Sequence, residues 1–193
     1  MRCVVLVIRV SKGVIYHKPG KIWLKIALIS DSHSYIDHKT LSYLQDADEI
    51  WHAGDIGDLS VMNALPSGKV IRGVYGNIDD HTVQEHYPEW LEFESAGVRV
   101  LMTHIGGKPP RYAKGVKKRI QESKAQLFVC GHSHICKVEF DRELNCLYLN
   151  PGAIGQQGFH QMRTLLLFDL ENGKIQNLRV VELGRRGVLS KGV

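Results

Sequence analysis

Five short segments of this chain end in the same way, with an apolar stretch followed directly by side chains that bind metals. In the first, Ile26 to Ile29 form an apolar run long enough for a buried strand, and Asp31 and His33 follow at once. Open α/β sheets place their sites at the ends of such strands. Since Asp31 and His33 are two residues apart in a segment predicted to be extended, we expect them to point to one side. One such pair is more typical of capping and hydrogen bonding, and its recurrence indicates a site.

The same arrangement follows four later strand candidates, at 49–53, 69–75, 98–103 and 126–130. Together the five strand ends carry seven oxygen or imidazole donors and no thiolate: Asp31, His33, Asp55, Asn77, His104, His132 and His134. Carboxylate and imidazole ligands suit manganese, iron, zinc, cobalt or nickel, whereas calcium prefers a cage of oxygens. Seven donors are too many for one ion that keeps an open position, and they favour two ions that share a carboxylate. We expect His132 and His134, on one side of an extended segment, to face different ions.

The predicted elements change character along the chain. The apolar spacing at 36–47 predicts a helix capped by Ser34 or Asp37, and residues 60–65 predict a shorter one between strands. A basic amphipathic helix is predicted from Tyr112 through Val116 to Ile120. Hairpins dominate the second half, with strands predicted at 90–94, 98–103, 126–130, 137–140, 146–149, 164–169 and 174–182. This order favours a mixed α/β fold with two sheets packed face to face and helices outside.

The length of 193 residues suits one domain with a sizeable core. We expect residues 1–23 to form an N-terminal extension outside the core, either disordered or the product of a mis-assigned start, because Arg9 and Pro19-Gly20 interrupt any long element. Its apolar run is too short to span a membrane. The domain itself is predicted at 24–184, and residues 185–193 form a basic tail.

The net charge of +5 is concentrated at the two ends of the chain and at 114–124. No run of Lys and Arg is interleaved with aromatic residues, so we interpret the charge as a solvated basic face and do not expect nucleic acid as a partner. The four cysteines include no C-x-x-C pair and follow no secretory signal. Free thiols and a cytoplasmic location are therefore expected.

The motifs together resemble one known family. Asp31-Ser32-His33, Gly54-Asp55, Gly76-Asn77, His104 and Gly131-His132-Ser133-His134 look like the motifs of the calcineurin-like metallophosphoesterase superfamily. The stretches 76–79 and 150–153 resemble its small prokaryotic phosphodiesterase branch. The resemblance covers about residues 24–183 and implies a four-layer α/β/β/α sandwich of two mixed sheets with helices outside.

The resemblance also implies roles for the seven donors. Asp31, His33 and His134 would hold one ion, Asn77, His104 and His132 the other, and Asp55 would bridge them. Asp55, Asn77 and His104 would take part in catalysis. The cofactors would be two divalent transition-metal ions, with manganese first and nickel, cobalt, iron or zinc as alternatives. A hydroxide bridging the ions would attack the phosphorus of a small phosphodiester substrate. Whether the chain forms a homo-oligomer is left open.

Two positions depart from the family pattern. Many superfamily phosphatases have histidine directly after the Gly-Asn asparagine, where this chain has Ile78, and the family's His-Gly appears here as His104-Ile105-Gly106. The first departure favours diesters over monoesters. Asp79 is a candidate, though not the favoured one, for a partner of a metal-binding imidazole. Residues 150–152 are interpreted as a turn that shapes the wall of the site.

Two other functions stay open on the same fold. The first is a protein-binding scaffold, since the same fold serves in eukaryotes as a retromer subunit whose metal site has degenerated. The presence of all seven ligand types favours an enzyme over that role. A nuclease would draw on the basic charge, but no separate nucleic-acid-binding segment is visible.

Overall fold

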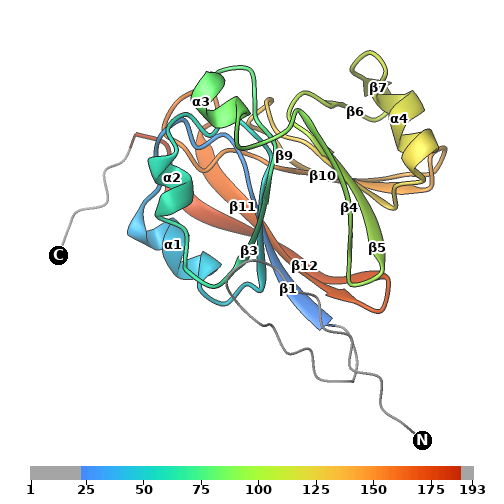
Figure 1. Cartoon of the computed structure of the whole chain (residues 1–193), viewed down its shortest axis with the longest axis horizontal. Helices are drawn as coiled ribbons and strands as arrows, with labels where there is room; N and C mark the ends of the chain where they lie inside the picture. The colour runs from blue at the N-terminus through green and yellow to red at the C-terminus, as the bar shows by residue number, and fades with distance from the viewer. Residues whose placement is uncertain (1–22, 188–193) are drawn as a thin grey trace, which may run out of the picture.

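The structure, a computed structural model, describes residues 23–187. The predicted N-terminal extension, apart from Trp23, and the predicted tail after Gly187 lie outside the described residues. The first sheet has the order β12-β11-β1-β2-β3, and the second has the order β4-β5-β8-β10-β9 (Figure 1). The bounds of the first sheet are β1 Trp23–Ile29, β2 Glu49–His52, β3 Val70–Gly73, β11 Met162–Glu171 and β12 Lys174–Arg185. Those of the second are β4 Trp90–Ser95, β5 Val98–Thr103, β8 Leu127–Val129, β9 Cys136–Asp141 and β10 Cys146–Pro151.

Both sheets are mixed, as predicted. Strands β1, β2 and β3 pair in parallel. Strand β11 pairs antiparallel with β1, and β12 pairs antiparallel with β11. In the second sheet β5, β8 and β10 are parallel neighbours with an antiparallel strand at each edge. Strand β12 continues to Arg185, which pairs with Met162, so regular structure runs one residue past the predicted domain end.

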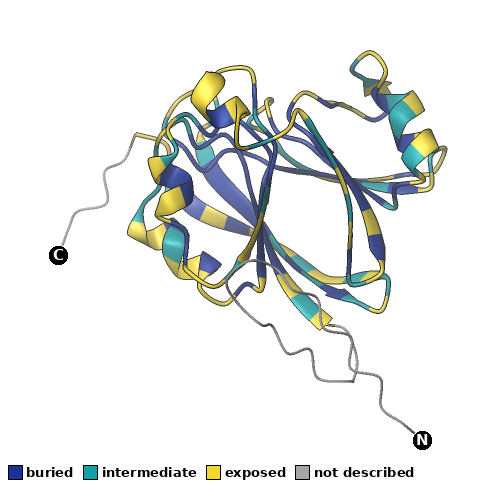
Figure 2. Ribbon diagram, viewed as in Figure 1, coloured by how far each residue is buried: buried dark blue, intermediate teal, exposed yellow. Residues whose placement is uncertain are grey.

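Strand β1 shows how the sequence pattern makes four layers. Ile26 and Leu28 belong to the apolar cluster between the two sheets, whereas Ala27 and Ile29 belong to the cluster under the helices. Because successive side chains point to opposite faces of a strand, a continuous apolar run requires cover on both sides. Figures 1 and 2 show this arrangement, with buried strands in the middle and exposed residues on the outer helices.

The helices confirm most of the sequence prediction. On the first sheet lie α1 (His38–Leu44), α2 (Ser60–Asn63) and the unpredicted α3 (His81–Gln84), and on the second lies α4 (Val116–Ser123). Of the two caps considered for α1, Asp37 is the one used, since its Oδ1 accepts from the Thr40 amide at 2.8 Å. No helix within residues 23–187 is long and apolar enough to cross a membrane.

The prediction that the basic helix includes Tyr112 was wrong. Tyr112 lies in β7 (Arg111–Tyr112), which pairs with β6 (Gly107–Lys108) in a two-stranded ribbon. Gly115 has a left-handed backbone, with φ of 83°, and the helix begins only after it. The i, i+4, i+8 spacing was real, but the left-handed residue interrupts the helical path between Tyr112 and Val116.

Candidate metal centre

The predicted ligands converge because the strands before them are neighbours. The loops after β1 and β2 continue the parallel pairing, with the Asp31 amide donating to Gly54 O and the His33 amide to Asp55 O, both at 3.0 Å. In the second sheet, the Gly131 amide donates to His104 O at 3.0 Å. The loops at the carboxyl ends of the parallel strands of both sheets therefore lie together. The His132 amide, which donates to Asp31 Oδ1 at 3.2 Å, joins the two sets of loops.

The backbone that carries these ligands is left-handed, not extended. Five ligand residues have positive φ: Asp31 (54°), His33 (47°), Asp55 (54°), His132 (67°) and His134 (58°). The prediction that the two Asp/His and His/His pairs sit on extended segments was therefore wrong. Non-glycine residues in this region cost on the order of 1–3 kcal/mol each, and such residues gather at functional sites where surrounding hydrogen bonds hold them.

Six of the seven predicted ligands form two groups that share Asp55. The first group is Asp31, His33, Asp55 and His134, and the second is Asp55, His104 and His132, with the ligand atoms of each group within 4.8 Å of one another. In the first, His134 Nε2 lies 3.2 Å from Asp31 Oδ1 and 3.4 Å from His33 Nε2. In the second, His104 Nε2 lies 3.1 Å from Asp55 Oδ1. The two groups are the division that a shared carboxylate predicts.

His104 shows that these residues fit a cation. Its Nδ1 lies 2.8 Å from the carbonyl of Ala53, which can only accept, so Nδ1 carries the proton and Nε2 presents a lone pair. That buried Nε2 has no hydrogen-bond partner, and the nearby Asp55 oxygen also carries lone pairs. A cation between two facing acceptors satisfies both, whereas two acceptors alone repel.

The carboxylates act on the same imidazoles electrostatically. The neighbouring carboxylate of Asp31 raises the pKa of His134, although burial opposes the shift. Burial lowers the pKa of His104, but the adjacent carboxylates of Asp55 and Asp31 outweigh it, so the net pKa is raised. The cluster thus attracts positive charge, and a metal ion must compete with protons for it.

Asn77 takes a different position from the six. It is exposed, and its side chain makes no hydrogen bond within the described residues, so its role as a ligand stays a prediction. Its neighbours do reach the centre: the Ile78 amide donates to Asp55 Oδ1 at 3.1 Å. A Cβ on Gly76 would collide with the same carboxylate and with the Asp55 amide, which explains why glycine precedes Asn77.

Asp79 does not contact an imidazole, so that interpretation was wrong. Its buried carboxylate accepts from the amides of Ile56 (3.1 Å), Gly57 (2.6 Å) and Gly76 (2.7 Å). These amides belong to the loops that carry Asp55 and Asn77. Asp79 is therefore a backbone clamp that holds two ligand loops together.

Asn150 has a similar role on the other side of the site. Its Nδ2 donates to Gly131 O at 2.7 Å and lies 3.2 Å from Ser133 Oγ, while its Oδ1 accepts from the Gly152 amide. The prediction of a turn at 150–152 was wrong for its first two residues, since Asn150 and Pro151 end strand β10. The prediction that this stretch shapes the site wall agrees with the buried Asn150 side chain, which fixes the His132–His134 loop.

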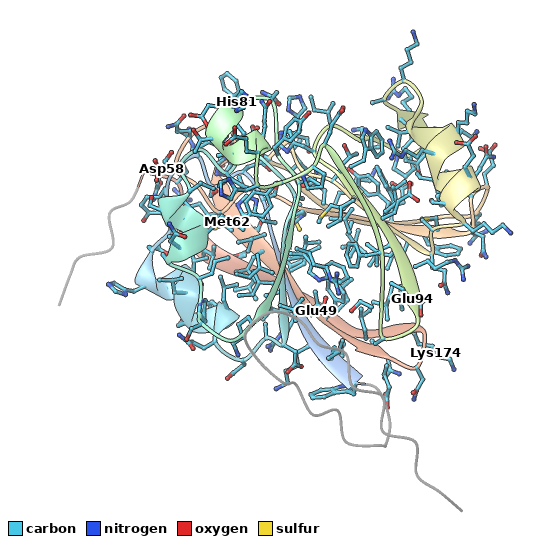
Figure 3. All side chains as sticks on the ribbon, viewed as in Figure 1. Glu49, Asp58, Met62, His81, Glu94 and Lys174 are labelled. Atoms are coloured by element: carbon cyan, nitrogen blue, oxygen red, sulfur yellow. The ribbon has the colours of Figure 1, made fainter. Side chains whose placement is uncertain are left out.

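Other histidines divide between surface and support. His81 stands on the surface at the start of α3 (Figure 3) and pairs with Glu85 at 3.1 Å. His52 is fully buried at the end of β2, 2.9 Å from Ser32 Oγ, and burial lowers its pKa to about 4.

Sequence reasoning missed His160, whose Nδ1 lies 3.1 Å from His134 Nδ1. His160 precedes a strand instead of following one, so the strand-end pattern could not find it.

Comparison with known proteins agrees with this geometry. Residues 24–173 match the model of the calcineurin-like phosphoesterase superfamily domain. A protein of Methanothermobacter thermautotrophicus named a probable metallophosphoesterase is 30% identical over 134 residues, which are 66% of this chain and 76% of the relative.

Two solved structures share the fold. The solution structure of a Thermotoga maritima protein is 26% identical, with a TM-score of 0.62 over 83% of this chain and 99% of that one. Vps29 of Chaetomium thermophilum is 13% identical, with a TM-score of 0.67 over 84% of this chain and 99% of that one. At 13% sequence identity, the likeness to Vps29 supports the fold alone.

Proposed function

Because the chain belongs to the calcineurin-like phosphoesterase superfamily, we propose that it is a phosphodiesterase that depends on two divalent metal ions. The observation that carries the proposal is the pair of donor groups that share Asp55. One carboxylate shared between two donor groups suits two ions held close together, as in two-metal phosphoester hydrolysis.

Asp31, His33 and His134 would hold one ion, His104, His132 and Asn77 the other, and Asp55 would contribute to both. When bound, such ions supply Lewis acidity, which activates water and neutralises charge on phosphoryl oxygens. The chain itself supplies orientation. The Ala53 carbonyl keeps the His104 proton on Nδ1, and the Ile78 amide steadies Asp55 Oδ1.

We propose manganese as the first candidate metal, with nickel, cobalt, iron or zinc as alternatives. Four of the seven predicted ligands are imidazoles, which favours these ions over magnesium. We also propose a cytoplasmic location, which the unpaired Cys130, Cys136 and Cys146 support. A small phosphodiester is the proposed substrate.

The preference for diesters rests on Ile78. Its side chain is 44% exposed and follows Asn77 directly, while its amide is anchored on Asp55. It has no proton to give to a leaving alkoxide and no charge to bind a monoester dianion. Since a general acid contributes typically about 10²–10⁴-fold, we propose that the enzyme hydrolyses diesters with good leaving groups better than monoesters.

A protein-binding scaffold is the second candidate, because Vps29 has the same fold. The test is metal analysis of the purified protein, followed by hydrolysis assays on matched aryl mono- and diesters with Mn²⁺, Co²⁺, Ni²⁺, Zn²⁺ and Mg²⁺. We expect two ions per chain and faster diester turnover with a transition metal than with magnesium. No stoichiometric metal and no turnover with any of these ions would favour the scaffold.

Replacing Ile78 with histidine should raise monoesterase activity relative to diesterase activity by about tenfold, most for alkyl leaving groups, because the new imidazole can donate a proton. The measurement is kcat/KM on aryl and alkyl mono- and diesters. Ile135→His is the matched control, since Ile135 is also exposed and also follows a ligand, His134. An unchanged ratio in Ile78→His at equal metal content would show that position 78 does not set the preference.

A further inference from the structure

A loop that the phosphoesterase proposal does not use lies against one of the predicted ligands. Residues 155–161 connect the turn after β10 to β11, and they bring His160 to the outer side of the His134 ring. The two rings meet edge to face, with centroids 5.1 Å apart and planes at 65°. His134 is thus held between Asp31 on its Nε2 side and His160 on its Nδ1 side.

The hydrogen bonds of His160 determine which atom of His134 carries a proton. His160 Nε2 lies 3.3 Å from the carbonyl of Gly155, which can only accept, so Nε2 carries the His160 proton. The neutral ring then offers a lone pair at Nδ1, 3.1 Å from His134 Nδ1. His134 must therefore donate from Nδ1, which leaves its Nε2 unprotonated toward Asp31 and His33.

The loop is built to hold this contact. A Cβ on Gly158, whose φ is 110°, would collide with the His134 ring, so only glycine lets the loop approach this closely. The far side of the loop is tied to the end of β12: Arg186 Nε donates to His160 O at 2.9 Å, and the Gly187 amide donates to Gln156 Oε1 at 2.6 Å. The position of His160 follows from tethers on both sides.

The support from His160 reaches one metal group only, because His134 belongs to the first group and to no other. His132, of the second group, is exposed, and its ring makes no hydrogen bond within residues 23–187. Its position depends on its backbone amide, 3.2 Å from both oxygens of Asp31. In the second group the ring of His104 is oriented by the Ala53 carbonyl, so a change at His160 should act on the first group alone.

We propose that His160 is a positioning residue, which fixes the proton of His134 on Nδ1 and thereby strengthens the metal position formed by Asp31, His33, Asp55 and His134. The inference rests on the proposed two-metal function. Outer hydrogen-bond partners of metal-binding histidines typically change metal affinity by about 10–100-fold when removed. The same range is expected here, confined to one of the two ions.

The test is calorimetric titration of the metal-free full-length chain with zinc, which is diamagnetic and so also permits NMR of the imidazoles. Wild type should bind two ions, with the His134 Nδ1 proton visible and Nε2 shifted by the metal. His160→Ala should weaken one ion by about 10–100-fold and lose the Nδ1 proton signal through exchange. His160→Asn retains an acceptor near Nδ1 and should restore both within about threefold. His81→Ala, at an exposed histidine, is the control.

The outcomes separate the two proposals. Wild-type affinity for both ions in His160→Ala, or equal weakening of both, would overturn the positioning role while leaving the two-metal function intact. A second variant guards against general damage: Gly158→Ala should displace the loop and weaken the same ion at an unchanged melting temperature of the metal-free protein. A wild-type chain that binds neither zinc nor manganese would overturn the proposed function, and this inference with it.

Discussion

Replacing Asp55 with alanine is expected to lower phosphodiesterase activity by more than about a hundredfold and to remove both metal ions, since metal activation supplies several kcal/mol. Asp55 is the one residue in both donor groups, with Oδ1 3.1 Å from His104 Nε2 and Oδ2 3.6 Å from His33 Nε2. Each other ligand serves one group. The loss should therefore exceed that of any other single ligand change.

The comparison that decides this prediction is Asp55→Ala against His33→Ala and Asp58→Ala. His33→Ala should retain one ion and more activity, because the second group is complete without it. Asp58 lies at the surface beside α2 (Figure 3), where its Oδ1 accepts from the Ser60 amide at 2.7 Å, so Asp58→Ala should retain both ions. Metal content by elemental analysis and kcat/KM on an aryl diester are the measurements. An Asp55→Ala protein with more activity than His33→Ala would refute the shared role.

The second large effect is expected at Asp79, which touches no predicted ligand side chain. Asp79→Ala should lower the free energy of unfolding by about 3 kcal/mol or more, because three amides lose a buried acceptor, each at a cost of about 1–3 kcal/mol. The melting temperature should fall by about 6–12 °C. Activity should fall further than stability explains, because the loops that carry Asp55 and Asn77 are no longer joined.

Asp80→Ala is the matched control for this change. The neighbouring Asp80 caps α3 by accepting from the Val83 amide at 3.2 Å, and loss of such a cap costs about 1 kcal/mol. Chemical denaturation gives the free energies, and zinc titration gives the metal affinities at a temperature where all variants are folded. Equal effects of Asp79→Ala and Asp80→Ala would show that the clamp does not matter. Lost stability with unchanged metal affinity would show that it does not position the site.

The sequence alone determined the layers and the position of the site. The apolar run of β1 alternates between two cores, and that alternation is a local property that requires cover on both faces. The strand ends likewise carry their ligand types in the local pattern, so six of seven predicted donors lie in two clusters. Hydrophobic periodicity and chemical identity can be read without knowing any partner.

Only the tertiary structure decided how those donors are held. The left-handed backbone at Asp31 and Asp55 depends on hydrogen bonds between loops, since the mild preference of Asp for this region does not specify it at any one position. Asp79 reaches amides 22 and 23 positions earlier as well as one nearby, and His160 reaches His134 across 26 positions. Such partners are chosen by which strands lie side by side, because a hydrogen bond needs its two atoms at about 3 Å however far apart they are along the chain. The ligands are thus local features, whereas their orientation is a property of the assembled sheets.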